Sequence, residues 1–462
     1  MSKLTKWFYS VLIGFFLLLF TLHWMKSDFL LGEEYGIMGE ILHLRYLTIS
    51  KIGWLTKQRE ERVRETLTDY LFIDMSNNNA LVYSDGTNKV RVDRQALANV
   101  LRELHKEEKK IRMVLCDILL LDTVDAHWGQ NPEQLDETQI EVLEGKAARI
   151  NKSLRDMLDS FQQKDKILLP QIYDSESRSK IGLAYNEIKT GIAQYKFQFN
   201  NSFYRYNYIT DGHRGVPIMM WDKLSSGKDT SYTKSFLGLS LLGGNSHRNG
   251  GITLNRIIPH FRITQDEIVK DKDYFTASEF RKELIADHSK PLIVVIGNFE
   301  TRDIHTTIFE KLTGPLLLVN LYEGIRHGDN FFEWWFILLT LGVYIYIGYN
   351  SINRLIFKEK HLHFPLPVRQ CVRISWGKKH IAWLSNIVSF IFCFSQYILF
   401  FLKYHFREHW VHILLVFYTV FSLIFFNHYL YLLAAVFGLI LLNFIIGLVR
   451  YFRAMNQVSY KK

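Results

Sequence analysis

The sequence predicts an α/β domain held between membrane-spanning segments. Short apolar runs of strand length end in polar residues and alternate with stretches whose apolar residues follow a helical period. An apolar stretch near the N-terminus is long enough to cross a bilayer, and aromatic-rich apolar tracts fill the C-terminal part. We therefore expect an N-terminal transmembrane anchor over residues 1–32, a three-layer α/β domain over residues 33–330 and a C-terminal bundle of transmembrane helices over residues 331–462.

The positive net charge of the chain belongs to the membrane segments. The formal charge is +10, but residues 1–24 and 331–462 together hold 15 basic and 3 acidic residues, which leaves 41 basic and 43 acidic residues between them. Basic residues beside membrane spans set topology. A nucleic-acid partner for the domain is therefore not supported, because it lacks the expected basic surface.

The three cysteines do not suggest a metal or disulfide framework. Cys116, Cys371 and Cys393 are far apart, and no CxxC or Cys/His spacing accompanies them. We expect small buried side chains and no cofactor.

Residues 7–24 form the first apolar stretch, and Lys3 and Lys6 precede it. A cleaved signal peptide is the competing interpretation, but no small-x-small cleavage site follows the apolar core. An uncleaved anchor is favoured. The two lysines then place the N-terminus in the cytoplasm and residues 33–330 outside it.

The first part of the domain predicts a strand–helix–strand unit. A charged helix over 33–66 leads to a strand over 70–74 that ends at Asp74, and residues 76–80 give a turn signal. A helix follows over 92–104 with Asp93 as its N-cap. The next strand covers 112–122, interrupted by Asp117 and closed by Asp122. This spacing predicts a βαβ unit with parallel pairing.

Further along, the patterns become more irregular. They predict a helix over 132–164, a strand over 166–173, antiparallel strands over 195–208 with a turn at Asp211-Gly212, a connecting loop over 243–251 and a short helix over 276–285. The aromatic residues of 195–208 suit packed strand surface better than stacking on a sugar.

The stretch from Leu292 to Asn320 is the strongest candidate for a site. A strand over 292–297 breaks at Gly297 into a polar loop, and a second apolar run follows over 314–320. In α/β domains, ligand crevices form at the carboxyl ends of strands. The loop residues that suit a polar or anionic ligand are Asn298, Arg302, Asp303, His305 and Thr306. Asp303 and His305 supply too few ligands for a typical metal site.

Three carboxylates also mark strand ends. Asp74, Asp117 and Asp122 end or interrupt apolar runs, so we expect them to converge at one edge of the sheet. Paired carboxylates can perform acid–base chemistry, but no nucleophile accompanies them. Salt bridges with Arg94 or Arg302 are the favoured interpretation.

The C-terminal part predicts four further spans, at about 331–349, 381–402, 410–426 and 429–449. The loop 350–380 carries seven basic residues and is expected in the cytoplasm. Five spans in all would leave a basic C-terminal tail outside, so a re-entrant hairpin or a different span count remains open.

The layout resembles the CHASE2 extracellular sensory domain family. The matching motifs are Ile73-Asp74, Arg94, Cys116-Asp117-Ile118-Leu119, Asp211-Gly212 with Arg214, the stretch 295–306, Gly314-Pro315, Asn320 and the run 327–330. The family's Trp-Pro-Trp-Pro-Arg segment is reduced here to Val90-Arg-Val-Asp-Arg94.

The resemblance implies an extracytoplasmic sensor in a bacterial inner membrane, with several spans and a small extracytoplasmic ligand. Family members usually carry a catalytic output domain, and none is evident here. We therefore expect that the protein is not an enzyme. We also expect that it signals through a separate partner protein in the membrane or the cytoplasm. The residues expected to bind the ligand are Asp74, Arg94, Asp117, Asn298, Arg302, Asp303, His305 and Thr306. The alternative is a structural component that uses the domain as a docking surface, and an envelope enzyme is the least supported.

Overall fold

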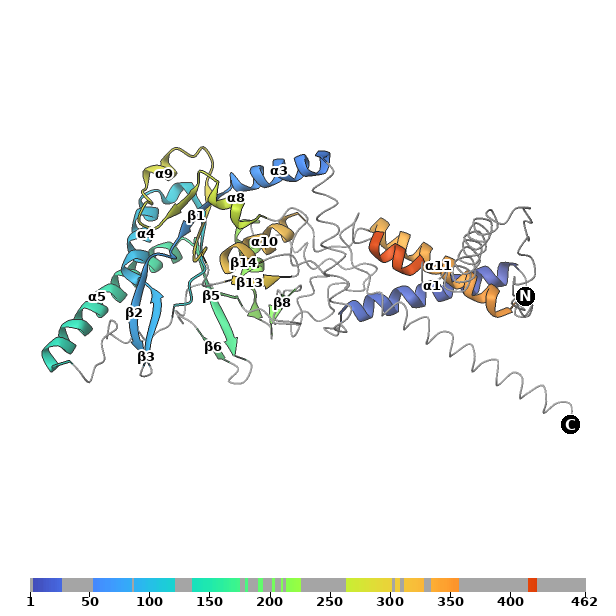
Figure 1. Ribbon diagram of the computed structural model, residues 1–462, viewed down its shortest axis with the longest axis horizontal. Helices are drawn as coiled ribbons and strands as arrows, with labels where there is room; N and C mark the ends of the chain where they lie inside the picture. The colour runs from blue at the N-terminus through green and yellow to red at the C-terminus, as the bar shows by residue number, and fades with distance from the viewer. Residues whose placement is uncertain are drawn as a thin grey trace, which may run out of the picture. The chain divides into compact units, whose positions relative to one another are not determined.

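The structure is a computed structural model, drawn in Figure 1. It describes residues 3–26, 53–84, 87–120, 135–174, 179–181, 190–193, 202–203, 209–210, 213–225, 263–300, 304–307, 311–327, 334–356 and 414–421. The chain forms two compact units, one of residues 1–29 with 333–462 and one of residues 30–332.

A mainly parallel sheet forms the centre of the unit 30–332. Its strands lie in the order β11-β1-β12-β4-β5-β6, with β7 also paired to β5, and only the β5–β6 pair is antiparallel. The predicted α/β class is thus confirmed. The bounds are β11 (Tyr274–Thr276), β1 (Tyr70–Asp74), β12 (Leu292–Gly297), β4 (Ile111–Cys116), β5 (Ile167–Asp174), β6 (Ser179–Ile181) and β7 (Thr190–Ile192).

One face of the sheet is covered by α4 (Arg94–Lys106) and α5 (Glu137–Gln162). Alternate residues of the central strands, among them Ile73, Val114 and Val294, are fully buried in one apolar cluster with Leu101 and Leu158 of these helices. Asp93 caps α4 as predicted, because its side chain accepts a hydrogen bond from the Gln95 N–H.

The opposite face meets α10 (Gly314–Arg326), which also contacts α6 (Val216–Leu224). Successive side chains of a strand point to opposite faces, so Tyr70, Phe72 and Val295 point toward this second layer. The hydrogen bond from Tyr70 to Glu323 of α10 joins the layers directly. The second apolar run of the sequence is therefore a buried helix.

Smaller elements surround the sheet. They are α3 (Gly53–Leu67), the hairpin β2 (Asn79–Ser84) and β3 (Thr87–Val92), the 3-10 turn η1 (Glu108–Lys110), β8 (Ser202–Phe203), the hairpin β9 (Ile209–Thr210) and β10 (His213–Arg214), α8 (Gln265–Val269), α9 (Glu283–Ala286), and the pair β13 (Ile304–Thr307) and β14 (Lys311–Thr313). The β9–β10 hairpin encloses Asp211-Gly212, at the predicted turn. Residues 243–251 lie outside the described part.

The pairing of the first two predicted strands was wrong in one respect. β1 and β4 run parallel, but β12 lies between them and pairs with both. The expectation paired β1 with β4 because they are neighbouring strands in the sequence. It did not consider β12, all six residues of which are buried. A strand with buried residues on both faces takes the centre of a sheet.

Two predicted boundaries were also wrong. β4 ends at Cys116, so Asp117 follows the strand instead of interrupting it. Residues 276–285 do not form one helix. The Glu279 carboxylate accepts hydrogen bonds from the Thr276 N–H and hydroxyl, which closes a turn, and the helix α9 starts only at Glu283.

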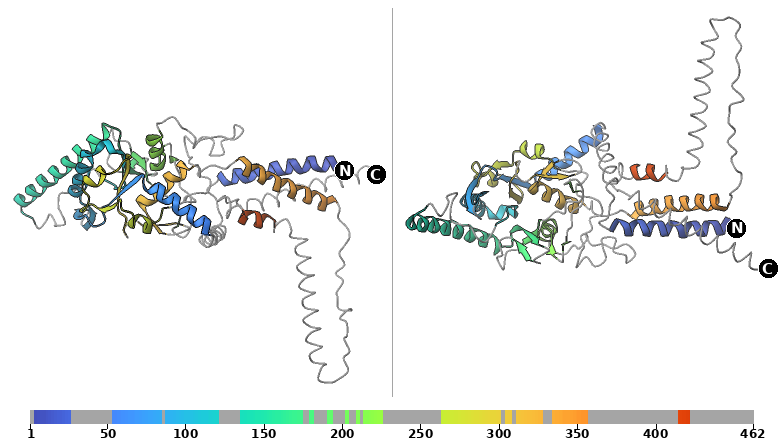
Figure 2. Two further views of the ribbon diagram at one scale, coloured as in Figure 1. Left: turned by 90° about the horizontal axis from the view of Figure 1, so that it is seen from above. Right: turned by 60° about the horizontal axis from the view of Figure 1, so that its bottom comes forward.

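In the other unit, α1 (Lys3–Lys26) and α11 (Trp334–Ile356) pack side by side, as both views of Figure 2 show. The pair is antiparallel, because Trp7 contacts Tyr349 while Thr21 hydrogen-bonds Tyr344 at 3.0 Å. Helical residues 414–421 also pack on α11, where Thr340 and Tyr418 share a hydrogen bond of 2.9 Å.

Two glycines allow the close packing of this helix pair. A Cβ on Gly14 would come within 2.5 Å of the Ile345 side chain, and one on Gly348 within 2.9 Å of the Ile13 side chain. Each helix thus places an isoleucine against a glycine of the other, and the missing glycine side chains let the two backbones approach closely.

Within the described residues, one helix is long and apolar enough to cross a membrane, over Lys3–Thr21. The position of this helix agrees with the predicted apolar stretch over residues 7–24. The predicted span 331–349 overlaps α11, and its apolar part Phe336–Asn350 is shorter. The predicted spans 381–402 and 429–449 and the loop 350–380 fall almost wholly outside the described residues.

Candidate functional site

The candidate site lies at the carboxyl ends of β1, β12 and β4. Asp74 is the last residue of β1, Asn298 follows β12 and Asp117 follows β4, so adjacent strands bring the three residues to one edge. Two backbone hydrogen bonds fix this edge, from Met75 to Gly297 at 2.8 Å and from Asp117 to Ile296 at 2.7 Å. Of the three carboxylates expected to converge, Asp74 and Asp117 lie at this edge, and Asp122 is outside the described residues.

Asp74 is the centre of a hydrogen-bonded group that we call the Asp74 cluster, made of Asp74, Ser76, Tyr274, Asn298 and Phe299. Asp74 is 2% exposed. Its Oδ1 accepts from the Ser76 N–H at 2.9 Å, the Ser76 hydroxyl and the Phe299 N–H at 3.1 Å. Its Oδ2 accepts from the Tyr274 hydroxyl at 2.8 Å. A carboxylate has about four acceptor positions, so protein donors satisfy this one.

The Asn298 side chain extends the same cluster along the loop. Its Oδ1 lies 2.8 Å from the Ser76 hydroxyl and accepts the Glu300 N–H at 3.0 Å. The Ser76 hydroxyl has one hydrogen, so it donates to either Asp74 or Asn298, while its oxygen accepts the Glu300 N–H at 3.1 Å. These bonds hold the start of the loop after β12 against the end of β1.

Gly297 is required here by a close approach. A Cβ at this position would lie 2.3 Å from Cγ of Pro315, at the first turn of α10, and 3.6 Å from the Asp117 Cβ. The glycine that ends β12 and the Gly314-Pro315 pair therefore form one packing contact. Two motifs of the sequence analysis are explained by the same steric need.

The remaining predicted residues are spread more widely. Arg94 donates to Asn151 of α5 at 2.8 Å, so this contact places it between α4 and α5. His305 and Thr306 were predicted in a loop, which was wrong, because they belong to β13, where they pair with Leu312 and Lys311. The β-branched residues Ile304, Thr306 and Thr307 around His305 suit a strand. Arg302, Asp303 and Asp122 lie outside the described residues.

A second buried carboxylate lies on the face that meets α10. Glu323 is 2% exposed in a helix whose other residues up to Ile325 are buried as well. We call Asp69, Tyr70, Glu323, Arg326 and His327 the Glu323 cluster. Tyr70 donates its hydroxyl hydrogen to Glu323 Oε1, Arg326 lies 3.2 Å from the same oxygen, and His327 Nε2 lies 3.3 Å from Oε2.

Arg326 links this carboxylate to the start of the sheet. Its Nη2 donates to Asp69 Oδ2 at 2.7 Å, immediately before β1. Burial and the neighbouring Glu323 carboxylate raise the pKa of the Tyr70 hydroxyl well above its usual value. The same two causes raise the pKa of Tyr322 to about 12. Both hydroxyl groups therefore stay protonated across the physiological pH range, and the Tyr70 hydroxyl can donate to Glu323 throughout it.

The described partners of the two buried carboxylates are hydroxyl groups, backbone N–H groups, an arginine and a histidine. The Ser76 hydroxyl beside Asp74 is shared between the Asp74 and Asn298 oxygens. Burial and the Asp74 hydrogen bond raise the pKa of Tyr274, so this phenol stays protonated. Across the described ranges, no group of three or more His, Cys, Asp or Glu side chains is placed to hold a metal ion. The hydrogen bonds and ion pairs of the two clusters hold loops, strands and helices of the domain in position.

Several cluster members were missed in the sequence. Ser76 was assigned only to a turn, although a serine two residues after a strand-end aspartate suits a local side-chain hydrogen bond. Glu323 gave a signal as a single acid within a long apolar helix. Tyr274 gave none, because its contact with Asp74 joins residues 200 positions apart.

Comparison of the chain with protein-family models, curated proteins and solved structures finds no match.

Proposed function

We propose that the protein is a membrane-anchored sensor of the CHASE2 type in a bacterial inner membrane. In this proposal residues 33–330 lie outside the cytoplasm and act through a separate signalling protein. The observation that carries it is the antiparallel pairing of α1 with α11, given by the contacts of Trp7 with Tyr349 and Thr21 with Tyr344.

The pairing supports the topology through charge. Because the helices are antiparallel, Lys3 and Lys6 lie at the same end of the pair as the C-terminus of α11, which leads into the basic loop 350–380. Basic residues favour the cytoplasmic side. The ends connected to residues 30–332 would then lie on the other side, which supports the proposed position of the α/β unit outside the cytoplasm.

The packing also supports an uncleaved anchor. Gly14 and Gly348 face isoleucines of the opposite helix, and Thr21 is hydrogen-bonded and fully buried. A removed signal peptide has no need of a fitted contact with a helix more than 300 residues later. We therefore propose that α1 remains as a permanent partner of α11, with the spans 381–402, 410–426 and 429–449 completing the bundle.

The Glu323 cluster supports transmission of a signal toward the membrane. Asp69 follows the helix that leaves the N-terminal anchor, and Arg326 is at the end of the helix that precedes α11. Their ion pair of 2.7 Å joins the segments that enter and leave the domain. Ligand binding that shifts α10 would move both segments together, provided the ligand favours one of two states.

The ligand site is proposed along the loop after β12. Hydrogen bonds of Asn298 and the Asp74 cluster hold the start of this loop, and β13 follows it; Arg302 and Asp303 come between them in the sequence. Basic and acidic side chains on such an anchored loop suit a small polar or anionic ligand.

The alternative proposal is a scaffold that docks a partner on the domain. The four donors around Asp74 favour it, because a satisfied carboxylate offers little to a ligand.

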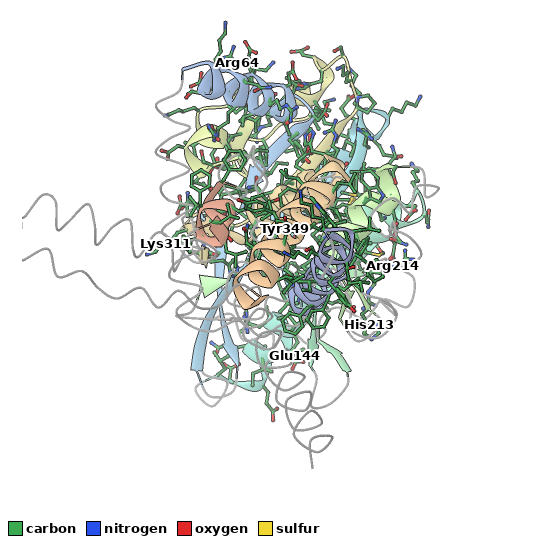
Figure 3. The ribbon with its side chains drawn as sticks, turned by 90° about the vertical axis from the view of Figure 1, so that its right-hand side faces the viewer. Arg64, Glu144, His213, Arg214, Lys311 and Tyr349 are labelled. Carbon is green, nitrogen blue, oxygen red and sulfur yellow. The ribbon has the colours of Figure 1, made fainter. Side chains whose placement is uncertain are left out.

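Substitution within the loop tests both proposals. The full-length protein with Arg302, Asp303 and His305 all changed to alanine is compared with a Lys311→Ala control, an exposed neighbour on β14 labelled in Figure 3. Proteins co-purifying from solubilised membranes are identified by mass spectrometry. A sensor keeps its signalling partner in both variants, whereas a scaffold loses it only in the triple variant. Recovery of no membrane or signalling protein with the unchanged chain would contradict the sensor.

A further inference from the structure

The exposed face of α5 carries features that its own domain does not explain. Its buried residues are confined to the second part of the helix, at Ala147, Ile150, Leu154, Leu158 and Phe161. The first turns extend beyond the sheet in both figures that show the whole ribbon (Figures 1 and 2). Since the helix has 3.6 residues per turn, the side directly opposite the buried residues is centred on Gly145.

Gly145 is an unfavourable residue for this place. Glycine inside a helix is destabilising relative to alanine, and a packing contact usually compensates for it. A Cβ on Gly145 would meet no atom within 4 Å. Val142, one turn away on the same side, is 62% exposed. The exposed side of the helix therefore carries a position without a side chain, Gly145, next to the apolar side chain of Val142.

The charges on this face are distributed in a self-complementary way. Glu137, Glu141 and Glu144 precede Gly145, Arg149 and Lys152 follow it, and Asp156 and Asp159 lie farther toward the C-terminus on the same side, all of them exposed. Since one turn takes 3.6 residues, Glu141, Arg149 and Lys152 lie close to the side centred on Gly145, whereas Glu144 lies about a quarter turn away. Glu144 is labelled in Figure 3. Acidic residues early in a helix also suit its dipole, but that effect acts within the first turn. It does not explain Glu141, Glu144 or the basic residues beyond Gly145.

We propose that this face binds α5 of a second copy of the chain, antiparallel, with the two-fold axis at Gly145. The two glycines then allow the helices to approach closely, Glu141 of one chain comes to the level of Arg149 and Lys152 of the other, and Val142 is covered. An interface across a two-fold axis uses the same surface on both chains. The acidic residue before Gly145 can then face the basic residues after Gly145 of the other copy. This proposal is independent of the sensory function.

Disulfide cross-linking of the full-length protein in membranes tests the arrangement. Gly145→Cys is introduced with Cys371→Ser and Cys393→Ser, because a residue on the axis meets its own copy. Val269→Cys, at a position that is 52% exposed on α8, is the matched control. Mild oxidation is expected to give a covalent dimer with the first variant and several-fold less with the second. Equal cross-linking of the two would overturn the proposal.

Charge exchange separates this interface from other routes to a dimer. In the Gly145→Cys chain, Glu141→Arg and Arg149→Glu are each expected to lower the cross-linked fraction several-fold, because each places like charges at one level. The two changes together are expected to restore most of it. Failure of the double variant to recover, or no effect of either single change, would overturn the proposed pairing.

Discussion

The two buried carboxylates, Asp74 and Glu323, are equally inaccessible but are held in different ways. Each is 2% exposed. Asp74 accepts from two backbone N–H groups and two hydroxyls, all neutral. Glu323 lies beside an arginine and a histidine and accepts one tyrosine hydroxyl. The first is held by local and backbone donors, the second by side chains from two elements.

The difference indicates separate roles. Backbone donors cannot be removed without moving the chain, so the Asp74 cluster fixes the geometry of the strand ends. Ion pairs between side chains can rearrange with less cost when the elements shift. The Glu323 cluster, which joins the start of β1 to the end of α10, is therefore the part of the domain better suited to rearrangement.

The largest expected effect is at Asp74. In Asp74→Ala, the Phe299 and Ser76 N–H groups and the Tyr274 hydroxyl lose their acceptor, which we expect to cost about 4 kcal/mol, at about 1–3 kcal/mol for each unsatisfied group and less than additively. Asp74→Asn keeps one oxygen toward the N–H groups and should cost less than half as much. Denaturant unfolding of the full-length protein measures both. Equal losses would show that the donors do not depend on this carboxylate.

Arg326→Ala is the next test and addresses the other carboxylate. It leaves Glu323 buried with its charge less compensated, at a cost of about 3 kcal/mol, the lower end for a broken buried pair, because the Arg326 side chain is 35% exposed. Adding Glu323→Leu should recover more than half of the loss. A double variant as unstable as Arg326→Ala would contradict the electrostatic explanation.

Gly297→Ala tests the steric contact at the strand ends. The new Cβ would overlap Pro315, and such overpacking costs about 1–3 kcal/mol. Pro315→Ala in the same chain removes the contacting Cγ and should relieve part of the loss. Gly342→Ala is the matched control, since a Cβ there meets nothing within 4 Å. Thermal unfolding that ranks Gly342→Ala as the more harmful change would refute the close approach.

The smallest effects concern the tyrosines that donate to each carboxylate. Tyr70→Phe and Tyr274→Phe should each cost about 1 kcal/mol at neutral pH through one lost hydrogen bond. Both phenols have a raised pKa in the folded state. Their contribution is therefore complete below the unfolded pKa of about 10 and is lost as the pH rises beyond it. Stability measured from pH 8 to 11 should fall more steeply for the unchanged chain than for the double variant.

Local patterns explain which parts of the fold were predictable. The strands over 70–74 and 292–297 and the helix capped by Asp93 follow from periodicity and capping within a few residues. The position of β12 between β1 and β4 depends on pairing between distant segments, which no local pattern specifies.

The same limit applies to the site. Asp74 and Asp117 could be placed at one edge because strand ends of a parallel sheet meet there, and the same edge holds Asn298 at the end of β12. The Arg326–Asp69 pair joins residues 257 positions apart, and its partners carry no motif. His305 was misplaced because the four residues of β13 form a short, mainly polar stretch without apolar/polar alternation, and their pairing is with other segments.

The most direct test of the proposed architecture is the side of the membrane on which the α/β unit lies. Val269→Cys, at an exposed position of α8 outside the proposed dimer interface, introduces a reactive thiol into the domain, and the native Cys371 falls in the basic loop 350–380 of the sequence. Spheroplasts, whose inner membrane is intact, are treated with a membrane-impermeant maleimide before and after permeabilisation. We expect the introduced thiol to react in intact spheroplasts, whereas Cys371 should react only after permeabilisation. Protection of the introduced thiol together with labelling of Cys371 in intact spheroplasts would contradict it.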